Sequence, residues 1–240
     1  MLRDGQSGAV GVGIATPRWK ELYRIGGIFY FIQALIVIFA IIAFFIWPYQ
    51  PGSASTTEVF ATLQSDRLGG LMALDLLFLI GTLLFVPPLL AMYVALKNVN
   101  ESYALLALVL GLVGVVALIP ARPITELVTL SNQYAATTTD TARSEYLAAG
   151  DALLVLFDGT AWLVSTIFIA LSGLISALLM LRSNIFSKAT AYIGIMTNCS
   201  ALGFFIPFIG IPLLFLATLG GLALQYLIGR RLLQLARTES

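Results

Sequence analysis

The apolar run LYRIGGIFYFIQALIVIFAIIAFFIW, residues 22–47, indicates the fold class of this chain, because Arg24 is its one charged residue. An apolar run longer than about 18 residues predicts a helix that crosses a membrane. The run also exceeds the roughly 7–15 apolar residues of a signal-peptide core. We therefore expect an uncleaved anchor, although PGSAS at 51–55 imitates a cleavage site.

The rest of the chain repeats this pattern. Of its 240 residues, 59% are hydrophobic and 10% are charged, against about 25% charged in soluble domains. The sequence predicts an all-α fold, a polytopic transmembrane helix bundle with six membrane-spanning helices and an outer helical hairpin. The predicted spans cover about 22–47, 68–96, 103–120, 159–181, 190–206 and 213–228.

The predicted transmembrane domain covers 21–233, between flexible cytoplasmic tails at 1–20 and 234–240. Its one long connection, 121–158, is expected to form the hairpin over the outer face. Pro123 suits a first helical turn, and Asp140 is a candidate cap for a helix that starts near Thr141 and runs into the fourth span. The composition leaves open whether this hairpin is a lid or a structural cap.

The basic residues predict the orientation of the bundle. Six spans put both termini on one side, and ten of the 13 Lys and Arg residues fall there. By the positive-inside rule, we expect a multi-pass protein of the cytoplasmic (inner) membrane with both termini cytoplasmic. The ten are Arg3, Arg18, Lys20, Arg24, Lys97, Arg182, Lys188, Arg230, Arg231 and Arg237, and the other three are Arg67, Arg122 and Arg143.

Several kinds of chemistry are disfavoured by what the sequence lacks. A net charge of +1 without a basic run argues against nucleic-acid binding. The chain has no histidine, the commonest metal ligand and general base, and Cys199 is its single cysteine. We predict no catalytic residue, no metal ligand and no cofactor. The expected partners are membrane lipids, a small apolar ligand, and a protein partner or a second copy.

The charged residues inside the apolar runs form the candidate site. Asp75 lies 22 residues before Lys97, Arg122 lies 21 after Glu101, and Asp158 lies 24 before Arg182. At about 1.5 Å per helical residue, all three lie about 32–36 Å from the inner rim, near the outer edge of the hydrocarbon core. The predicted charged layer comprises Asp75, Arg122, Glu126, Asp151 and Asp158.

This layer has two interpretations: a polar pocket open to the outside, or an ion pair that only neutralises charge at the interface. Arg122 is expected to bind Asp75 or Asp158, with Asp158 as the structural partner. Asp151 is expected nearer to water, on the same helical face as Asp158, at the mouth of any pocket under the hairpin.

Two further patterns predict how the helices are shaped and packed. Pro87 and Pro88 lie inside the second span, where proline frees backbone carbonyls and favours a kink. The fourth span carries small residues at small-xxx-small spacing, which predicts close helix contact within the chain rather than a dimer face. These residues are Ser172, Gly173, Ser176 and Ala177.

Four patches resemble an uncharacterised bacterial family of multi-pass membrane proteins, domain of unknown function 4386. They are RIGGIFYFI at 24–32, ALKNVNESYALLALVLGLVG at 95–114, AAGDALLVLFDGTAW at 148–162 and SNIFSKATAYIGI at 183–195. The resemblance covers most of the chain from Arg24 onward. The resemblance implies a protein of six helices. It does not indicate any particular activity, and it assigns no functional role to any residue.

The sequence is compatible with three functions. The first is a non-enzymatic membrane protein that binds a lipid or small molecule, or supports a partner. The second is a secondary transporter or channel, which three-plus-three helices would suit by inverted repetition. The third, ranked last, is a lipid-processing enzyme that uses Asp75, Asp151 and Asp158, with magnesium as the candidate cation.

Overall fold

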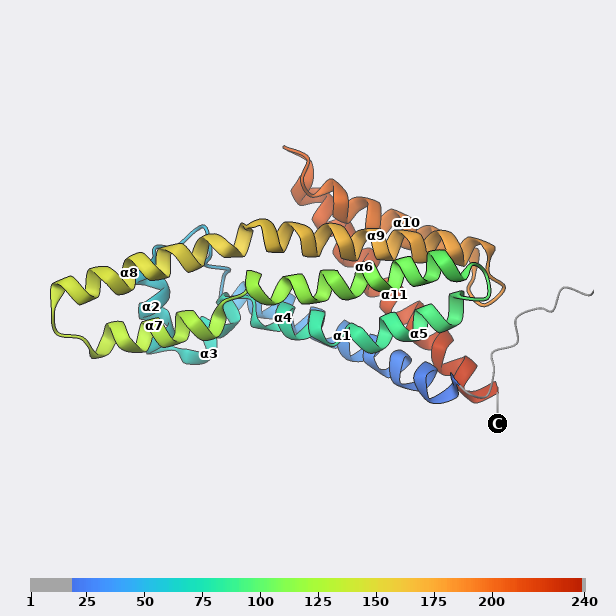
Figure 1. The fold of residues 1–240 in the computed structure, drawn as a ribbon, viewed down its shortest axis with the longest axis horizontal. Helices are drawn as coiled ribbons and strands as arrows, with labels where there is room; N and C mark the ends of the chain where they lie inside the picture. Colours follow the sequence, from blue (N-terminus) through green and yellow to red (C-terminus); the bar gives the residue numbers. More distant parts are fainter. Residues whose placement is uncertain (1–18, 239–240) are drawn as a thin grey trace, which may run out of the picture.

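The computed structural model describes residues 19–238, which form an all-α membrane bundle with a helical layer at one end (Figure 1). We call this the hairpin end, and the opposite end, where α1 begins, the terminal end. The predicted tail at 1–20 lies outside the described residues except for Trp19, the N-cap residue of α1, and Lys20, its first helical residue. The helices of the bundle are α1 (Lys20–Ile46), α4 (Leu76–Leu83), α5 (Val86–Leu96), α6 (Glu101–Leu118), α9 (Thr160–Arg182), α10 (Lys188–Gly203) and α11 (Gly210–Thr238).

The number of long spans differs slightly from the prediction. Within residues 19–238, five stretches are long and apolar enough to cross a membrane, namely Lys20–Ile46, Leu76–Leu96, Glu101–Ala136, Asp140–Arg182 and Gly210–Arg237. The predicted span at 190–206 is the helix α10, whose 16 residues extend about 24 Å, less than a ~30 Å hydrocarbon core. The described part of the chain thus has five full-length spans and one short helix packed between α9 and α11.

The second predicted span is broken in two places. Asp75, with φ of 68°, separates α3 (Arg67–Ala73) from α4, so the continuous helix expected from 68 is wrong. The second break, at Leu84 and Phe85, comes just before Pro87 and Pro88, as their sequence predicted. The amide of Phe85 bonds to Thr82, and the side-chain amide of Gln33 on α1 donates to the carbonyl of Gly81 at 2.9 Å.

The last helix is longer than predicted at both ends. It begins at Gly210, so Pro212 falls in its first turn rather than in the connecting loop. It continues to Thr238, through most of the segment expected to be a tail from 234. Leu232 and Ala236 explain this extension, because both are buried in an apolar core at the terminal end that also contains Tyr23 of α1.

Four helices form the layer at the hairpin end: α2 (Thr56–Ser65), α3, α7 (Ile124–Ala136) and α8 (Asp140–Leu154). We call it the outer layer. The predicted hairpin is present as α7 and α8, and α8 continues through the 3-10 turn η3 (Val155–Asp158) towards α9. In Figure 1, α7 and α8 prolong the directions of α6 and α9, so the hairpin projects from the bundle instead of lying across its face.

The caps of the hairpin differ in detail from the prediction. Pro123 precedes α7 as its N-cap residue, one position earlier than expected. Thr139 caps α8 by accepting a hydrogen bond from the amide of Ala142, and Asp140 is the first helical residue. Because Thr139 supplies the hydroxyl one position earlier, the prediction of Asp140 as the cap is wrong.

The outer layer has its own apolar core. Phe60, Leu127 and Phe157 are almost completely buried there, and they come from α2, α7 and η3. Gln64 of α2 donates to Ser131 of α7 at 2.9 Å, and Ser131 donates to the carbonyl of Phe60 at 3.2 Å. The outer layer is therefore a packed structural unit at the hairpin end of the bundle.

Candidate functional site

Arg122 lies at the junction between the bundle and the outer layer. It follows the 3-10 turn η2 (Ile119–Ala121) and precedes α7. Arg122 therefore lies at the point where the backbone passes from the bundle into the outer layer. Its side chain is 3% exposed. A buried guanidinium requires partners for its N–H groups, because an unpaired buried charge is costly.

The structure supplies these partners from three elements. Nε and Nη2 of Arg122 donate to Oδ2 of Asp75 at 3.2 and 3.1 Å. Nη1 donates to the carbonyl oxygens of Ala121 and Phe157, both at 2.9 Å. The predicted pairing of Arg122 is therefore confirmed, and the carboxylate that it selects is that of Asp75.

The break before α4 places Asp75. Asp75 is in the left-handed region, which aspartate enters more readily than most residues, and it occupies the N-cap position of α4. Its side chain is 29% exposed, so the carboxylate contacts the guanidinium on one side and remains accessible on the other. A continuous helix through residue 75 would require a right-handed backbone conformation there, so the break and the position of Asp75 depend on each other.

Aromatic rings surround the ion pair. The guanidinium carbon of Arg122 lies 5.1 Å from the ring centroid of Phe157 and 5.6 Å from that of Phe78. Tyr49, in the link between α1 and α2, contacts Phe157 edge-to-face at 6.5 Å. Burial raises the pKa of the Tyr49 hydroxyl, Arg122 lowers it, and Asp75 and Asp158 raise it, so Tyr49 stays neutral near pH 7.

The other residues of the predicted layer have different places. Asp158 is exposed in η3, and the guanidinium contacts the carbonyl of the adjacent Phe157, so the expectation that Asp158 is the structural partner of Arg122 is wrong. Asp151 on α8 accepts a hydrogen bond from the hydroxyl of Thr56 and thereby joins α8 to α2. Glu126 is exposed on α7.

The three aspartates considered for an enzyme therefore have three separate roles. Asp75 binds Arg122, Asp151 binds Thr56, and Asp158 is exposed. Within residues 19–238, no group of three acidic, cysteine or histidine side chains lies close enough to hold a metal ion. The arrangement is that of a structural junction with one accessible carboxylate.

That carboxylate lines a hollow of about 50 Å³, which we call the rim hollow. Its walls come from the end of α1, the link that follows, and both sides of the break at Asp75. The lining residues are Ala40, Ala43, Phe44, Trp47, Tyr49, Met72, Asp75 and Leu77. A single water needs roughly 10–15 Å³ by this measure, so the rim hollow accommodates a small chemical group of several atoms.

Sequence reasoning missed most of this hollow. Trp47 ends the first predicted span and Tyr49 follows it, in the order WPY, and aromatic residues at the end of a span were the pattern that could have indicated this place. The indole N–H of Trp47 donates to Oδ2 of Asp66 at 2.8 Å. Asp66 also caps α3 through the amide of Gly69, so these two bonds fix the wall beside Trp47.

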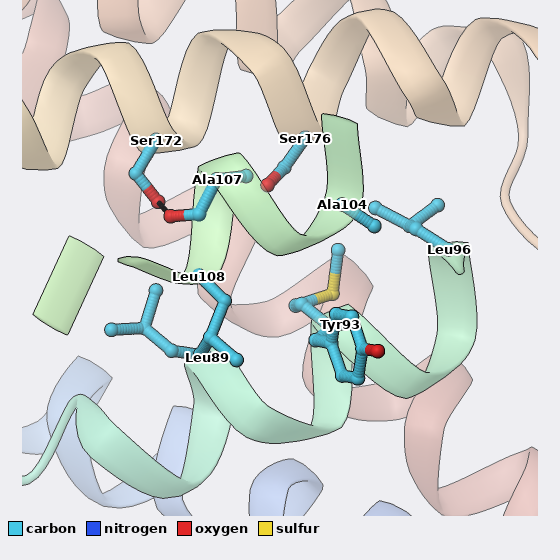
Figure 2. A pocket seen from close by; sticks show the side chains of 9 residues that line it. Leu89, Tyr93, Leu96, Ala104, Ala107, Leu108, Ser172 and Ser176 are labelled. Carbon is cyan, nitrogen blue, oxygen red and sulfur yellow. Dashed lines mark hydrogen bonds between the residues drawn. The ribbon is translucent and has the colours of Figure 1, made fainter. Parts of the chain in front are cut away.

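A second, smaller hollow lies towards the terminal end, between α5, α6 and α9 (Figure 2). Its volume is about 10 Å³, at or below the space that one water requires. Ser172 donates to the carbonyl of Ala107 across it at 2.6 Å. This hollow is a feature of close helix packing rather than a binding site.

The small residues of α9 serve that packing, as predicted. A Cβ built on Gly173 would lie 2.1 Å from Oδ1 of Asn198 on α10, and one on Gly194 of α10 would lie 2.8 Å from Cβ of Ala177. Ser172 is buried against α6. The small-xxx-small positions of α9 thus contact α6 on one side and α10 on the other, within the same chain.

Taken together, the apolar helices and their packing define a multi-pass integral membrane protein. A family profile described as Domain of unknown function (DUF4386) matches residues 25–230, and the chain belongs to this family. The resemblance drawn from the four sequence patches is thereby confirmed. None of the curated proteins and none of the solved structures matches the chain.

Proposed function

We propose that this protein is a non-enzymatic membrane protein that binds an amphipathic lipid in the rim hollow. The observation that carries the proposal is the composition of the hollow. Ala40 and Ala43 on α1 leave space between larger side chains, and Asp75 presents a polar group at the same place. A hollow with mostly apolar walls and one carboxylate suits the boundary between the hydrocarbon chain and the polar headgroup of a lipid.

The surroundings of the hollow support access from the bilayer. Phe39, Phe44 and Phe45 on the same part of α1 are 57–80% exposed, which suits contact with lipid tails. Aromatic residues such as Trp47 and Tyr49 are typical of the depth at which lipid headgroups begin. A lipid could therefore enter sideways, with its chain along α1.

We also propose the cytoplasmic membrane as the location, with the terminal end in the cytoplasm and the outer layer outside. The described basic residues support this orientation, since eight of eleven belong to the terminal end and only Arg67, Arg122 and Arg143 to the hairpin end. The rim hollow then opens at the outer leaflet, and the outer layer acts as a structural cap because of its packed core.

The binding proposal is tested by filling the hollow. Ala40→Leu places a larger side chain in it, whereas Ala223→Leu makes the same change on the exposed face of α11. Purified wild-type protein is expected to retain a lipid in native mass spectrometry, the Ala223→Leu variant equally, and the Ala40→Leu variant much less. Equal lipid retention by all three proteins would contradict the proposal.

A second candidate function, secondary transport, is favoured by the two breaks between α3 and α5. Gln33 is 5% exposed, and its Oε1 has no hydrogen-bond partner among residues 19–238. Broken helices and an unsatisfied polar group inside a bundle are features of transport pathways. If Gln33→Cys in a Cys199→Ser background reacts with a hydrophilic thiol reagent from the outer side, a water path exists and transport is favoured over binding alone.

A further inference from the structure

We propose that the rim hollow recognises the primary ammonium group of an amine-bearing lipid such as phosphatidylethanolamine. This inference rests on the proposed lipid-binding function and adds the chemical class of the headgroup. It follows from three properties of the hollow: the free acceptor on Asp75, the absence of an available cation, and the aromatic walls.

The first property is an unused hydrogen-bond acceptor. Both hydrogen bonds from Arg122 to Asp75 end on Oδ2. Oδ1 has no hydrogen-bond partner in the part of the chain that the structure describes, and the side chain is 29% exposed while it lines the hollow. A carboxylate oxygen can only accept, so its complement on a ligand is an N–H or O–H donor.

The second property concerns charge. Arg122 contacts Asp75 in the wall of the hollow, but its side chain is 3% exposed and already donates four hydrogen bonds. Arg67 donates to Asn132 on α7. The Arg122 guanidinium is thus buried among its partners, and Arg67 is not among the residues that line the hollow.

Acidic groups, in contrast, lie around it. Asp66 holds Trp47 in the wall, and Asp158 is near enough to Tyr49 to affect the electrostatics of its hydroxyl. Asp75 and Asp158 thus lie near Tyr49, and Asp66 binds Trp47. Among the described residues, the one guanidinium near Tyr49 is that of Arg122, which pairs with Asp75. The local excess of negative charge attracts a cation and repels the phosphate of an anionic lipid.

The third property is the aromatic wall. Phe44, Trp47 and Tyr49 line the hollow beside Asp75. Aromatic rings next to a carboxylate form a common environment for ammonium groups, because the ring faces attract a cation and the carboxylate accepts its N–H. The volume of about 50 Å³ favours a primary ammonium over a bulkier trimethylammonium.

The experiment compares headgroups on identical acyl chains. Full-length, delipidated protein in detergent is titrated with dioleoyl phosphatidylethanolamine, phosphatidylcholine or phosphatidylglycerol, and apparent Kd values are measured by native mass spectrometry. The ethanolamine lipid is expected to bind at least about tenfold more tightly than the glycerol lipid, the difference that one charge-assisted hydrogen bond supplies. The choline lipid is expected to bind at an intermediate level.

Variants connect this preference to the hollow. Asp75→Asn keeps an oxygen for Arg122 but removes the charge, and it is expected to abolish the preference for ethanolamine over glycerol. In case this variant does not fold, Trp47→Leu provides a second test, with an expected loss of about threefold to tenfold in ethanolamine-lipid affinity. Trp162→Leu, away from the hollow, is the matched control and is expected to leave the affinity unchanged.

The outcomes separate the two proposals. Equal or tighter binding of the glycerol lipid, with Ala40→Leu still weakening it, would overturn the ammonium inference and keep lipid binding in the hollow. Binding of no lipid, or binding that Ala40→Leu leaves unchanged, would overturn the proposed function as well. A preference for ethanolamine that both Asp75→Asn and Trp47→Leu leave intact would overturn the assignment to this hollow.

Discussion

Arg122 and Asp75 are 47 positions apart in the chain, and their side chains meet at 3.1 Å between Nη2 and Oδ2. The pair joins the start of α4 to the end of η2, where the chain leaves the bundle for the outer layer. Nη1 of Arg122 also donates to the carbonyl oxygen of Phe157 in η3, where the chain returns from the outer layer to the bundle. One side chain thus joins three of the four places where the chain passes between the two layers, and the fourth is the link from α1 to α2.

Replacement of Arg122 by methionine is expected to destabilise the protein strongly. The change leaves the carboxylate of Asp75 and the carbonyl of Phe157 without their partner, and loss of one member of a buried ion pair costs about 3–5 kcal/mol. The measurement is unfolding by sodium dodecyl sulfate in mixed micelles. Arg67→Met is the control, because Arg67 is exposed and its loss should cost less than about 0.5 kcal/mol. Equal effects of both changes would show that the junction does not depend on Arg122.

Gly26→Ala is expected to loosen the contact between α1 and α5. A Cβ at residue 26 would lie 2.4 Å from Cβ of Ala91 and 3.3 Å from the carbonyl of Pro87, so the helices must separate. Overpacking of this kind costs about 1–3 kcal/mol. Gly221→Ala is the matched control, since nothing lies within 4 Å of its added Cβ, and it should be neutral or stabilising by up to about 1 kcal/mol. Thermal unfolding of both variants in one detergent measures the difference, and a stable Gly26→Ala variant would contradict the close approach.

The proposed orientation predicts which turns react with a membrane-impermeant maleimide in intact cells. In a Cys199→Ser background, Thr138→Cys in the turn between α7 and α8 should be labelled from outside. Asn98→Cys, in the turn between α5 and α6, should be labelled only after the cells are permeabilised. The reverse labelling pattern would place the outer layer in the cytoplasm and the basic terminal end outside, and it would contradict the proposed orientation.

Acid is expected to weaken the wall of the rim hollow at Trp47. The amide of Gly69 and the indole N–H of Trp47 lower the pKa of Asp66 below its usual value of 3.8. The bonds to the carboxylate therefore contribute stability fully above about pH 4, and this contribution is lost as the pH falls through the folded pKa. Tryptophan fluorescence between pH 7 and pH 2 should report the release of Trp47. Asp66→Asn, which keeps an acceptor without a titratable charge, should remove this transition, and its persistence in that variant would assign it to another group.

The amino-acid sequence was sufficient to predict that this protein lies in a membrane, and it predicted much of the architecture. Apolar runs such as residues 22–47 exceed what a soluble fold can bury, so a membrane bundle follows from the hydrophobic effect alone. Local rules also predicted the helical hairpin, the break before Pro87 and Pro88, and the tight packing of small residues on α9. Helical rise placed Asp75 and Arg122 at one depth, which was enough to predict that Arg122 would find a carboxylate.

The carboxylate that pairs with Arg122 could be identified only from the packed structure, because the depth of a residue along its helix does not define its position around the bundle. The left-handed conformation of Asp75 turns one helix into two, and no local pattern predicted that break. The extension of α11 to Thr238 likewise depends on the burial of Leu232 and Ala236 against distant residues. The rim hollow has the same origin: α1, the link at Trp47 and Tyr49, and the break at Asp75 form a site only because long-range packing brings their side chains together.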